Sequence, residues 1–342
     1  MNVNFDYFNR LTTDMLCQVA LSGVSGIQVA PYANIGDVNN KGIELNVNYR
    51  NKLNDLKYSV GFNIGSVRNE VKKVGRGEDA YISSATFRAL GDLARTEAGH
   101  PIASYYGFVT DGIYQSQAEI DSLNLLAQIA TGNNRAFFDA GAQPGDIRMK
   151  DINNDSLINQ DDMTYIGNPH PKFTYGLNLD LEYKMFDLRI FGQGVYGNDI
   201  FMATIYYLES GDGYWNLLTT VNDYWEKEGD KTNMPRLGQS QGNLRVSDRY
   251  IKNGSFFRLK NIQVGYTIPQ SFTNRYGIAR FRIYLAGQNL VTFRNYKGFD
   301  PEIGFGRNQG VSPNQRGTLD IGIDRGNYPV AKSWSIGLNL SF

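Results

Sequence analysis

The segment Trp334-Ser335-Ile336-Gly337-Leu338-Asn339-Leu340-Ser341-Phe342 ends the sequence with a large apolar residue at every second position. Side chains of a β-strand point alternately to its two faces, so this segment has one apolar and one polar face. A C-terminal strand that is apolar toward lipid and polar toward the lumen is typical of bacterial outer-membrane barrels. The segment therefore predicts a membrane-spanning strand, with Phe342 as the terminus that closes the barrel.

The same two-residue alternation recurs along the whole chain. In the clearest case, residues 173–183 alternate Phe, Tyr and Leu with polar residues and Gly, and a second run follows at 186–190. Only a tight turn at Lys184 and Met185 fits between these two runs. Further runs lie at residues 3–7, 43–50, 58–65, 104–114, 256–268 and 279–292. The phase of one of them flips near Lys260 and Asn261, which predicts a β-bulge. The patterns together predict an all-β chain forming an antiparallel transmembrane β-barrel segment.

The lengths of the connections constrain the topology, because barrel strands alternate in direction, with short turns inside and long loops outside. Counting back from the final strand puts short inner turns at 184–185, 269–278 and 51–56. One more strand, placed at 86–98 despite poor alternation, is needed to keep this order, which gives about ten strands. The long outer loops then lie at about residues 11–35, 69–85, 115–170, 197–255 and 293–330.

About ten strands with such long loops suit a part of a larger barrel, since barrel diameter grows with strand number. Edge strands open to lipid would leave backbone polar groups without partners. We therefore expect residues 1–342 to be the C-terminal part of an outer-membrane barrel that further chain completes.

The composition excludes some function classes. With 34 basic and 34 acidic residues the chain has no net charge to attract nucleic acid. No apolar run is long enough for a spanning helix, and the mean hydropathy of -0.40 does not exclude a barrel, whose lipid face is hidden in alternation. The single Cys17 cannot form an intrachain disulfide. His100 and His170 both lie beside prolines, and no Ser/His/Asp set is visible, so we expect no enzyme.

Residues 151–162 carry oxygen ligands at the spacing of a calcium-binding loop. The predicted ligands are Asp151, Asn153, Asp155, the backbone carbonyl of Leu157, Asn159 and Asp162. Two features depart from the usual pattern: Ser156 occupies the position of the turn glycine, and Asp162 that of the bidentate glutamate. The segment predicts a structural Ca²⁺ site in an outer loop; the alternative is an Asx-rich turn without metal.

Aromatic and charged residues suggest two further sites. Tyr206, Tyr207, Trp215, Tyr224 and Trp225 lie in the loop 197–255, where they could stack on a sugar ring, pack against a lipoprotein, or form the loop's own core. Near the turn at Lys184, the charged residues Asp180, Glu182, Asp187 and Arg189 should face the lumen. There they could contact a plug domain or simply line a hydrated wall.

Several motifs, in order along the whole chain, resemble the C-terminal part of SusC/RagA-type TonB-dependent transporters of the Bacteroidota outer membrane. They include Asn40-Lys41-Gly42-Ile43-Glu44, Thr110-Asp111-Gly112-Ile113-Tyr114, Pro144-Gly145-Asp146-Ile147, Ile166-Gly167-Asn168-Pro169, Gly192-Gln193-Gly194, Arg258-Leu259-Lys260-Asn261 and Gly287-Gln288-Asn289-Leu290. The plug domain and the TonB box, which precede this part in that family, have no counterpart in the sequence.

The resemblance implies a barrel of about 22 strands. It further implies that the transporter imports oligosaccharides or oligopeptides, is energised by TonB through the plug, and is capped by a SusD-like surface lipoprotein. The expected location is the bacterial outer membrane, in contact with lipid. Two other functions stay open from sequence alone: a surface protein for glycan binding or adhesion, and an outer-membrane barrel enzyme.

Overall fold

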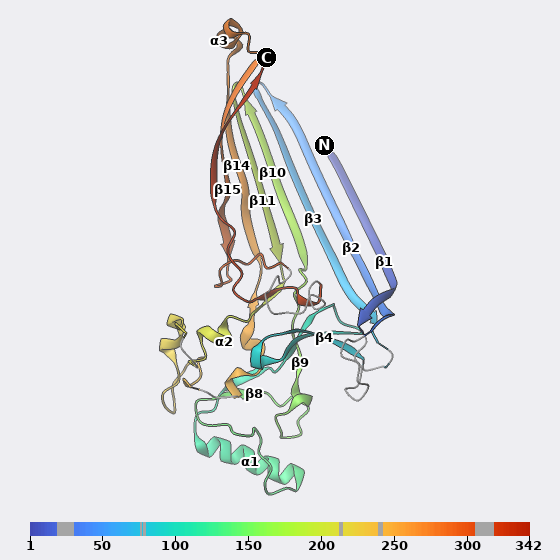
Figure 1. Ribbon diagram of the computed structural model, residues 1–342, viewed down its shortest axis with the longest axis vertical. Helices are drawn as coiled ribbons and strands as arrows, with labels where there is room; N and C mark the ends of the chain where they lie inside the picture. Colours follow the sequence, from blue (N-terminus) through green and yellow to red (C-terminus); the bar gives the residue numbers. More distant parts are fainter. Residues whose placement is uncertain (19–30, 76, 78–79, 212–214, 239–241, 305–317) are drawn as a thin grey trace.

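An eight-stranded antiparallel sheet dominates the molecule, and we call it the wall (Figure 1). The computed structural model describes residues 1–18, 31–75, 77, 80–211, 215–238, 242–304 and 318–342. In spatial order the wall contains β1 (Asn2–Gln18), β2 (Tyr32–Leu53), β3 (Leu56–Lys73), β10 (Phe173–Tyr183), β11 (Phe186–Tyr196), β14 (Phe256–Ile268), β15 (Arg280–Arg294) and β17 (Ser333–Ser341).

The strand register aligns apolar side chains into rows across the wall. One row runs through Tyr58, Leu181, Leu188, Val264, Leu285 and Ile336. The next row, one residue along each strand and hence on the opposite face, runs through Ser59, Asp180, Arg189, Gln263, Ala286 and Ser335. Ile336 is 78% exposed, so this apolar face is not covered by other parts of the described chain. The alternation thus produces a two-faced sheet with its apolar side open.

Local features of the wall agree with the sequence. Two-residue turns join Tyr183 to Phe186 and Leu53 to Leu56, and Lys184 adopts a left-handed conformation with φ 53°. The register against β11 skips Lys260, which is the predicted β-bulge. The antiparallel β-architecture, the tight turn at Lys184 and the bulge are therefore confirmed.

The predicted number of about ten wall strands is wrong, because the wall has eight. Residues 86–98 and 104–114, which we expected in the wall, instead form short strands beyond its end, and β3 pairs directly with β10. A wall of eight strands and a wall of ten strands both keep the alternation of strand direction, because they differ by an even number of strands. Counting directions along the chain therefore could not distinguish eight strands from ten. Ser104, Tyr105, Gly107 and Phe108 are all buried, so this segment belongs to a packed core and not to a lipid face.

The long connections all leave the same end of the wall and form what we call the outer region (Figure 1). It contains the sheet β4 (Tyr81–Thr86), β5 (Asp92–Glu97), β6 (Ser104–Gly107) and β9 (Thr164–Gly167); the sheet β13 (Ile251–Asn253), β12 (Asp199–Met202) and β16 (Ile323–Asp324); and the pair β7 (Thr110–Ile113) and β8 (Ile147–Met149). It also contains the helices α1 (Gln117–Thr131) and α2 (Ile205–Leu208), whereas α3 (Gln270–Thr273) lies at the opposite end of the wall.

A shared hydrophobic core joins the three long connections of the outer region. Leu93 and Tyr105 from the connection after β3, Phe201 and Tyr250 from the connection after β11, and Ile323 from the connection after β15 are nearly or fully buried in one cluster. Because each connection supplies apolar side chains that the others cover, the three fold as one unit.

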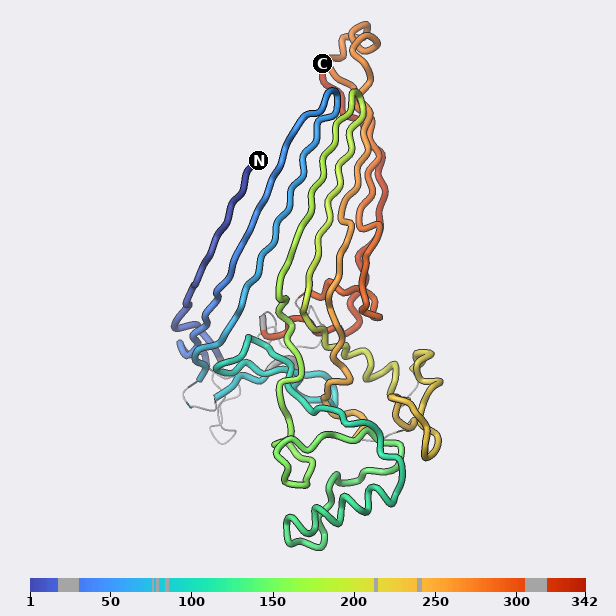
Figure 2. The backbone as a smooth tube through the Cα atoms, turned by 180° about the vertical axis from the view of Figure 1, so that it is seen from behind, coloured from blue at the N-terminus to red at the C-terminus, as the bar shows by residue number. Residues whose placement is uncertain are grey.

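The two outermost wall strands, β1 and β17, lie at opposite edges (Figure 2). Within the described ranges, each of them pairs with a neighbour on one side only. Strands also extend further than expected at the outer loops, since β1 continues to Gln18 and β2 starts at Tyr32. Parts of the predicted outer loops, including residues 19–30 and 305–317, lie outside the described residues.

Among the described residues, no helix is both long and apolar enough to cross a bilayer.

Candidate functional site

The predicted calcium loop lies in the outer region between β8 and β9, and its side-chain oxygens accept hydrogen bonds from the loop's own backbone. Asp151 Oδ2 accepts from the N–H of Ser156 at 2.8 Å, and Asp155 Oδ1 accepts from the N–H of Leu157 at 2.8 Å. Asp162 closes the loop, since its two oxygens accept from the N–H groups of Ile152 and Asn159 at 2.8 and 2.9 Å. The spacing seen in the sequence therefore corresponds to a closed loop.

Two details of this loop bear on metal binding. Ser156 has φ 66°, so the position usually held by glycine does adopt the left-handed conformation here. The carboxylate of Asp162 is fully buried with backbone N–H partners, and Asp151 Oδ1 is buried without any hydrogen-bond partner. These orphaned and buried oxygens suit a hard cation.

Other details favour the Asx-rich turn. Asn153 Oδ1 and Asn159 Oδ1 accept from the N–H groups two residues ahead, as in Asx turns. Among the residues that the structure describes, no group of three or more His, Cys, Asp or Glu is gathered closely enough to hold a metal ion. The donor types fit calcium, and the site stays a prediction.

The five predicted loop aromatics fall into two groups that contact different parts of the outer region. In the first group, ring centroids lie 5.2 Å apart for Tyr206 and Tyr207, and 5.0 Å apart for Tyr207 and Trp215. Phe87 joins this group, 6.0 Å from Tyr206 and 5.8 Å from Tyr207. Tyr206 packs against the hydrophobic core, whereas Trp215 is 56% exposed. This group presents an accessible aromatic surface.

The second group holds loops together. The Trp225 Nε1–H donates to Gln115 Oε1 at 3.3 Å, and the neighbouring Tyr224 pairs with Met234 in an isolated bridge. A Cβ on Gly145, where φ is +88°, would lie 2.4 Å from the Trp225 ring, so only glycine fits there. Trp225 therefore packs against the connection after β3, and the roles considered for these aromatics stay predictions.

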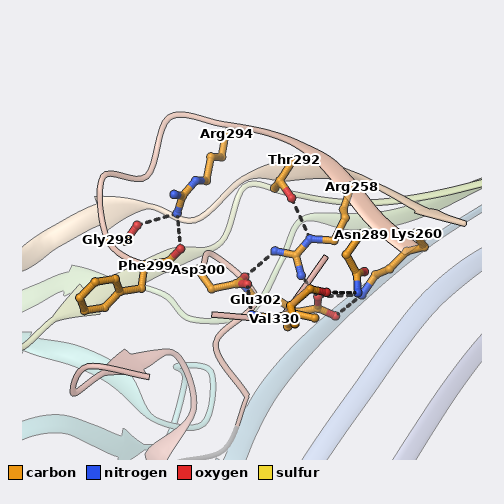
Figure 3. Close-up of polar contacts among 11 residues, drawn as sticks. Arg258, Lys260, Asn289, Thr292, Arg294, Gly298, Phe299, Asp300, Glu302 and Val330 are labelled. Carbon is orange, nitrogen blue, oxygen red and sulfur yellow. Dashed lines mark hydrogen bonds and ion pairs between the residues drawn. The ribbon is translucent and has the colours of Figure 1, made fainter. Parts of the chain in front are cut away.

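A buried ionic cluster anchors the connection after β15 to the wall (Figure 3). The guanidinium of Arg258 on β14 donates to Asp300 Oδ1 at 2.6 Å, to Glu302 Oε2 at 2.8 Å and to Thr292 Oγ1 at 2.9 Å. Lys260 reaches Glu302 at 2.7 Å. Arg258 and Asp300 are 3% and 5% exposed, so the pair is almost entirely removed from water. Sequence reasoning quoted Arg258 in a motif but missed this role.

The Asp300 carboxylate is stabilised in its charged form. Burial by itself would raise its pKa, but the N–H of Glu302, the guanidinium of Arg258 and the N–H of Val330 outweigh burial and hold the pKa below its ordinary value. The N–H of Val330 donates to Asp300 Oδ2 at 3.1 Å. One carboxylate thus fixes both ends of the connection 295–332.

The charged residues expected on the lumen side gather near the turn at Lys184. Asp180 pairs with Arg189 at 3.4 Å, Lys57 with Glu182 at 3.4 Å, and Arg282 with Asp187 at 2.5 Å. By strand register they share the polar face of the wall, opposite the apolar rows. This placement agrees with the prediction, whereas contact with a plug domain stays a prediction.

The two histidines have structural contacts. His100 stacks on Tyr165 with centroids 3.6 Å apart, and its carbonyl accepts from the N–H of Val71 at 2.9 Å. His170 Nε2 lies 2.9 Å from the carbonyl of Ile102, and burial lowers its pKa.

Comparisons with known proteins bear on the whole chain. TonB-dependent receptor P3 of Formosa agariphila is 35% identical over 344 residues, which cover 100% of this chain and 32% of the receptor. TonB-dependent receptor SusC of Bacteroides thetaiotaomicron is 24% identical over 341 residues, covering 98% of this chain and 30% of SusC. The chain is a homologue of the SusC-type TonB-dependent receptors. No protein-family model matches it.

The fold comparison agrees with this SusC-type relationship. The structure of the RagAB peptide transporter matches with a TM-score of 0.72 at 24% identity, over 99% of this chain and 33% of that chain. The resemblance to SusC/RagA-type transporters and the predicted fold class, a segment of such a barrel, are confirmed. The chain spans about a third of the length of the curated relatives it matches. These relatives are named as receptors and not as enzymes.

Proposed function

We propose that this chain supplies about a third of an active transporter in the bacterial outer membrane. The observation that carries the proposal is the wall, whose apolar rows cross adjacent strands and stay exposed, as a lipid-facing surface requires. The names of the homologous TonB-dependent receptors support transport over adhesion or catalysis.

The open edges of β1 and β17 are where we expect the remainder of the transporter barrel to pair, since a lipid-exposed sheet edge would leave backbone groups unsatisfied. The polar face near Lys184, with its ion pairs, suits contact with a plug domain inside that barrel. TonB would act through the plug domain, and a SusD-like lipoprotein would cover the outer region.

The cargo under this proposal is an oligosaccharide or an oligopeptide. The matched RagAB structure is of a peptide transporter, which supports a peptide. The aromatic group of Tyr206, Tyr207 and Trp215 lies in the outer region with Trp215 exposed, and such rings could equally stack on a sugar. Tyr224 and Trp225 contact a different part of the outer region and would not belong to this surface.

A structural calcium ion completes the proposal. The carboxylates of Asp151 and Asp162 and the carbonyl of Leu157 would hold it, together with Asn153, Asp155 and Asn159, and it would stiffen the loop between β8 and β9. The supporting observations are the buried, partnerless Asp151 Oδ1 and the buried Asp162.

Topology and function can be tested in cells. An epitope inserted after Gly132, at the end of α1, should be stained on intact cells, whereas the same epitope at Asn54 in the turn between β2 and β3 should be stained only after permeabilisation. The opposite pattern contradicts the proposed orientation.

Uptake is the decisive test of function. Cells lacking the protein, and cells lacking TonB, should both lose uptake of a labelled oligosaccharide or oligopeptide mixture. Normal uptake combined with impaired attachment to glycan surfaces would instead establish the adhesion function.

A further inference from the structure

A cavity of about 710 Å³ lies in the outer region, next to the sheet β4–β5–β6–β9. This sheet lies directly beyond the end of the wall from which the long connections leave (Figure 1). The cavity is also lined by Asn159 and Gln160 from the end of the predicted calcium loop, and by Gly242 and residues 244–246 of the connection after β11. Its size is that of a site for a small oligomer.

The guanidinium of Arg95 lies in this cavity between two tyrosine rings. Its Cζ is 3.7 Å from the ring centroid of Tyr106 and 4.1 Å from that of Tyr81. The strand register explains the arrangement: Arg95 on β5 pairs with Ser83 on β4 and with Ser104 on β6, and each tyrosine is two residues from one of these partners. All three side chains therefore share one face of the sheet.

Tyr106, which is itself anchored, fixes one face of the Arg95 guanidinium, and Tyr81 covers the other. The Tyr106 hydroxyl donates to the carbonyl of Met163 at 2.8 Å, and its ring contacts Tyr165 edge-on at 5.2 Å. The rings of Tyr81 and Tyr106 cover the two faces of the guanidinium, so its N–H donors point outward in the plane of the group. A planar, pre-positioned row of N–H donors is the geometry that binds a carboxylate with two parallel hydrogen bonds.

The charge of Arg95 is not neutralised by a salt bridge within the described residues. The other arginine of the cavity, Arg245, is committed to Asp139 by two hydrogen bonds of 2.6 and 3.1 Å. Glu97 on the same strand accepts from the Tyr165 hydroxyl. Asp92 also lines the cavity but is not within salt-bridge distance of Arg95. Among the residues that the structure describes, this half-buried arginine has no carboxylate partner, although burial of an unpaired charge is costly.

From this arrangement we propose that the cavity binds a carboxylate group of an oligomeric ligand, with Arg95 as its bidentate partner and the rings of Tyr81 and Tyr106 as flanking surfaces. The inference deepens the proposed function and rests on it insofar as the ligand is the imported cargo. The carboxylate could belong to the C-terminus of a peptide or to a uronic acid of an oligosaccharide.

Binding to the purified intact protein tests this directly and does not depend on import. The probes are a fluorescent tetrapeptide with a free C-terminus, the same peptide as its C-terminal amide, an oligogalacturonate, and a neutral galactose oligomer of equal length. One of the two carboxylate probes should bind more tightly than its neutral counterpart, and which of them does so identifies the source of the carboxylate.

Substitutions of Arg95 test whether this side chain is the one that binds the carboxylate. Arg95→Gln should weaken the binding of the carboxylate probe roughly 10- to 100-fold, because charge-assisted hydrogen bonds are lost. The binding of the neutral probe should not change. Arg95→Lys, which keeps the charge but not the planar fork, should fall between wild type and Arg95→Gln, and it serves if Arg95→Gln fails to fold. Arg135→Gln, which removes an equal charge from an exposed position after α1, is the matched control.

Three outcomes would overturn the proposal: no preference for carboxylate in either probe pair, equal losses in Arg95→Gln and Arg135→Gln, or full affinity in Arg95→Gln. Carboxylate binding that depends on Arg95 in a protein that imports nothing would leave the cavity assignment standing and refute only the transport function.

Discussion

The wall and the outer region are stabilised in different ways. The wall is a ladder of backbone hydrogen bonds between long strands, and its apolar side chains lie on an open face. The outer region has short strands, a buried core shared by three connections, and buried carboxylates such as Asp146, Asp162 and Asp300. In the wall the solvent on each side dictates the residue type, whereas in the outer region individual side-chain partners do. The difference predicts where single substitutions will act and how strongly.

The largest effect should come from a charge on the apolar face of the wall. Ile336→Arg should destabilise the membrane-inserted protein by about 2–4 kcal/mol, because a cation would face hydrocarbon. Ser335→Arg, one residue away on the polar face, should cost much less. Reversible unfolding in lipid vesicles measures both, and equal losses would contradict the two-faced wall.

The buried ionic cluster should show the next largest effect. Arg258→Met leaves Asp300 buried without its cation, which should cost about 1–3 kcal/mol locally and release the connection 295–332. Limited proteolysis should cut this connection faster, while cleavage in α1 stays unchanged. Arg294→Met, which removes only exposed hydrogen bonds to the carbonyls of Gly298 and Phe299, is the control.

The same cluster gives a pH dependence. The pKa of Asp300 is lower in the folded protein than in the unfolded chain, so its stabilisation is fully present above the ordinary carboxyl pKa and is lost as the pH falls through the lowered value. Acidification into this range should speed proteolysis of the connection 295–332. Arg258→Met protein keeps the N–H partners of Asp300 but loses its cation, so it should lose part of this dependence; an unchanged profile would argue against Asp300 as the titrating group.

Calcium should have a smaller, local effect. At ten times its dissociation constant, the ion would stabilise the loop 151–162 by about 1.4 kcal/mol, measured as slower hydrogen exchange than with chelator. Asp151→Asn should abolish the difference, and Asp161→Asn, an exposed neighbour outside the ligand pattern, should keep it. Equal exchange with calcium and with chelator in the unsubstituted protein would favour the Asx-rich turn without metal, and a response that survives Asp151→Asn would contradict Asp151 as a ligand.

The smallest effects should come from the histidines. His100→Ala and His170→Ala each remove a stacking or hydrogen-bond contact in the outer region, which should cost about 1 kcal/mol or less. Uptake per assembled protein should equal that of wild type. Loss of uptake with normal assembly would point to a role for these side chains that the present structure does not suggest.

How far the sequence predicts this fold depends on the region. The strands at residues 173–183 and 186–190, the turn at Lys184 and the bulge at Lys260 were predictable, because a sheet with one apolar and one polar face leaves a strict two-residue pattern. Residues 104–114 misled the strand count since the pattern there reflects a packed core. Pairings such as Phe201 with Ile323, a parallel contact between distant segments, leave no local signal.

The same distinction applies to the candidate sites. The ligand spacing of residues 151–162 was visible because all ligands lie in one short segment. The partners of Arg258 lie more than forty residues away, at Asp300 and Glu302. The stacking of Arg95 between Tyr81 and Tyr106 depends on the register of three strands. Sites built across strands in this way need coordinates.

The pairing of β3 with β10 ends at Gly65 and Thr174, so the chain between these two residues departs from and returns to neighbouring positions. That stretch carries Arg95 and the 151–162 loop, yet its core residues Leu93 and Tyr105 pack against Phe201, Tyr250 and Ile323 of the other two connections. A foreign segment inserted here would leave the ladder of the wall in register but would have to fit this shared core. The three connections should therefore diverge together during evolution, while the strand pairing of the wall is kept.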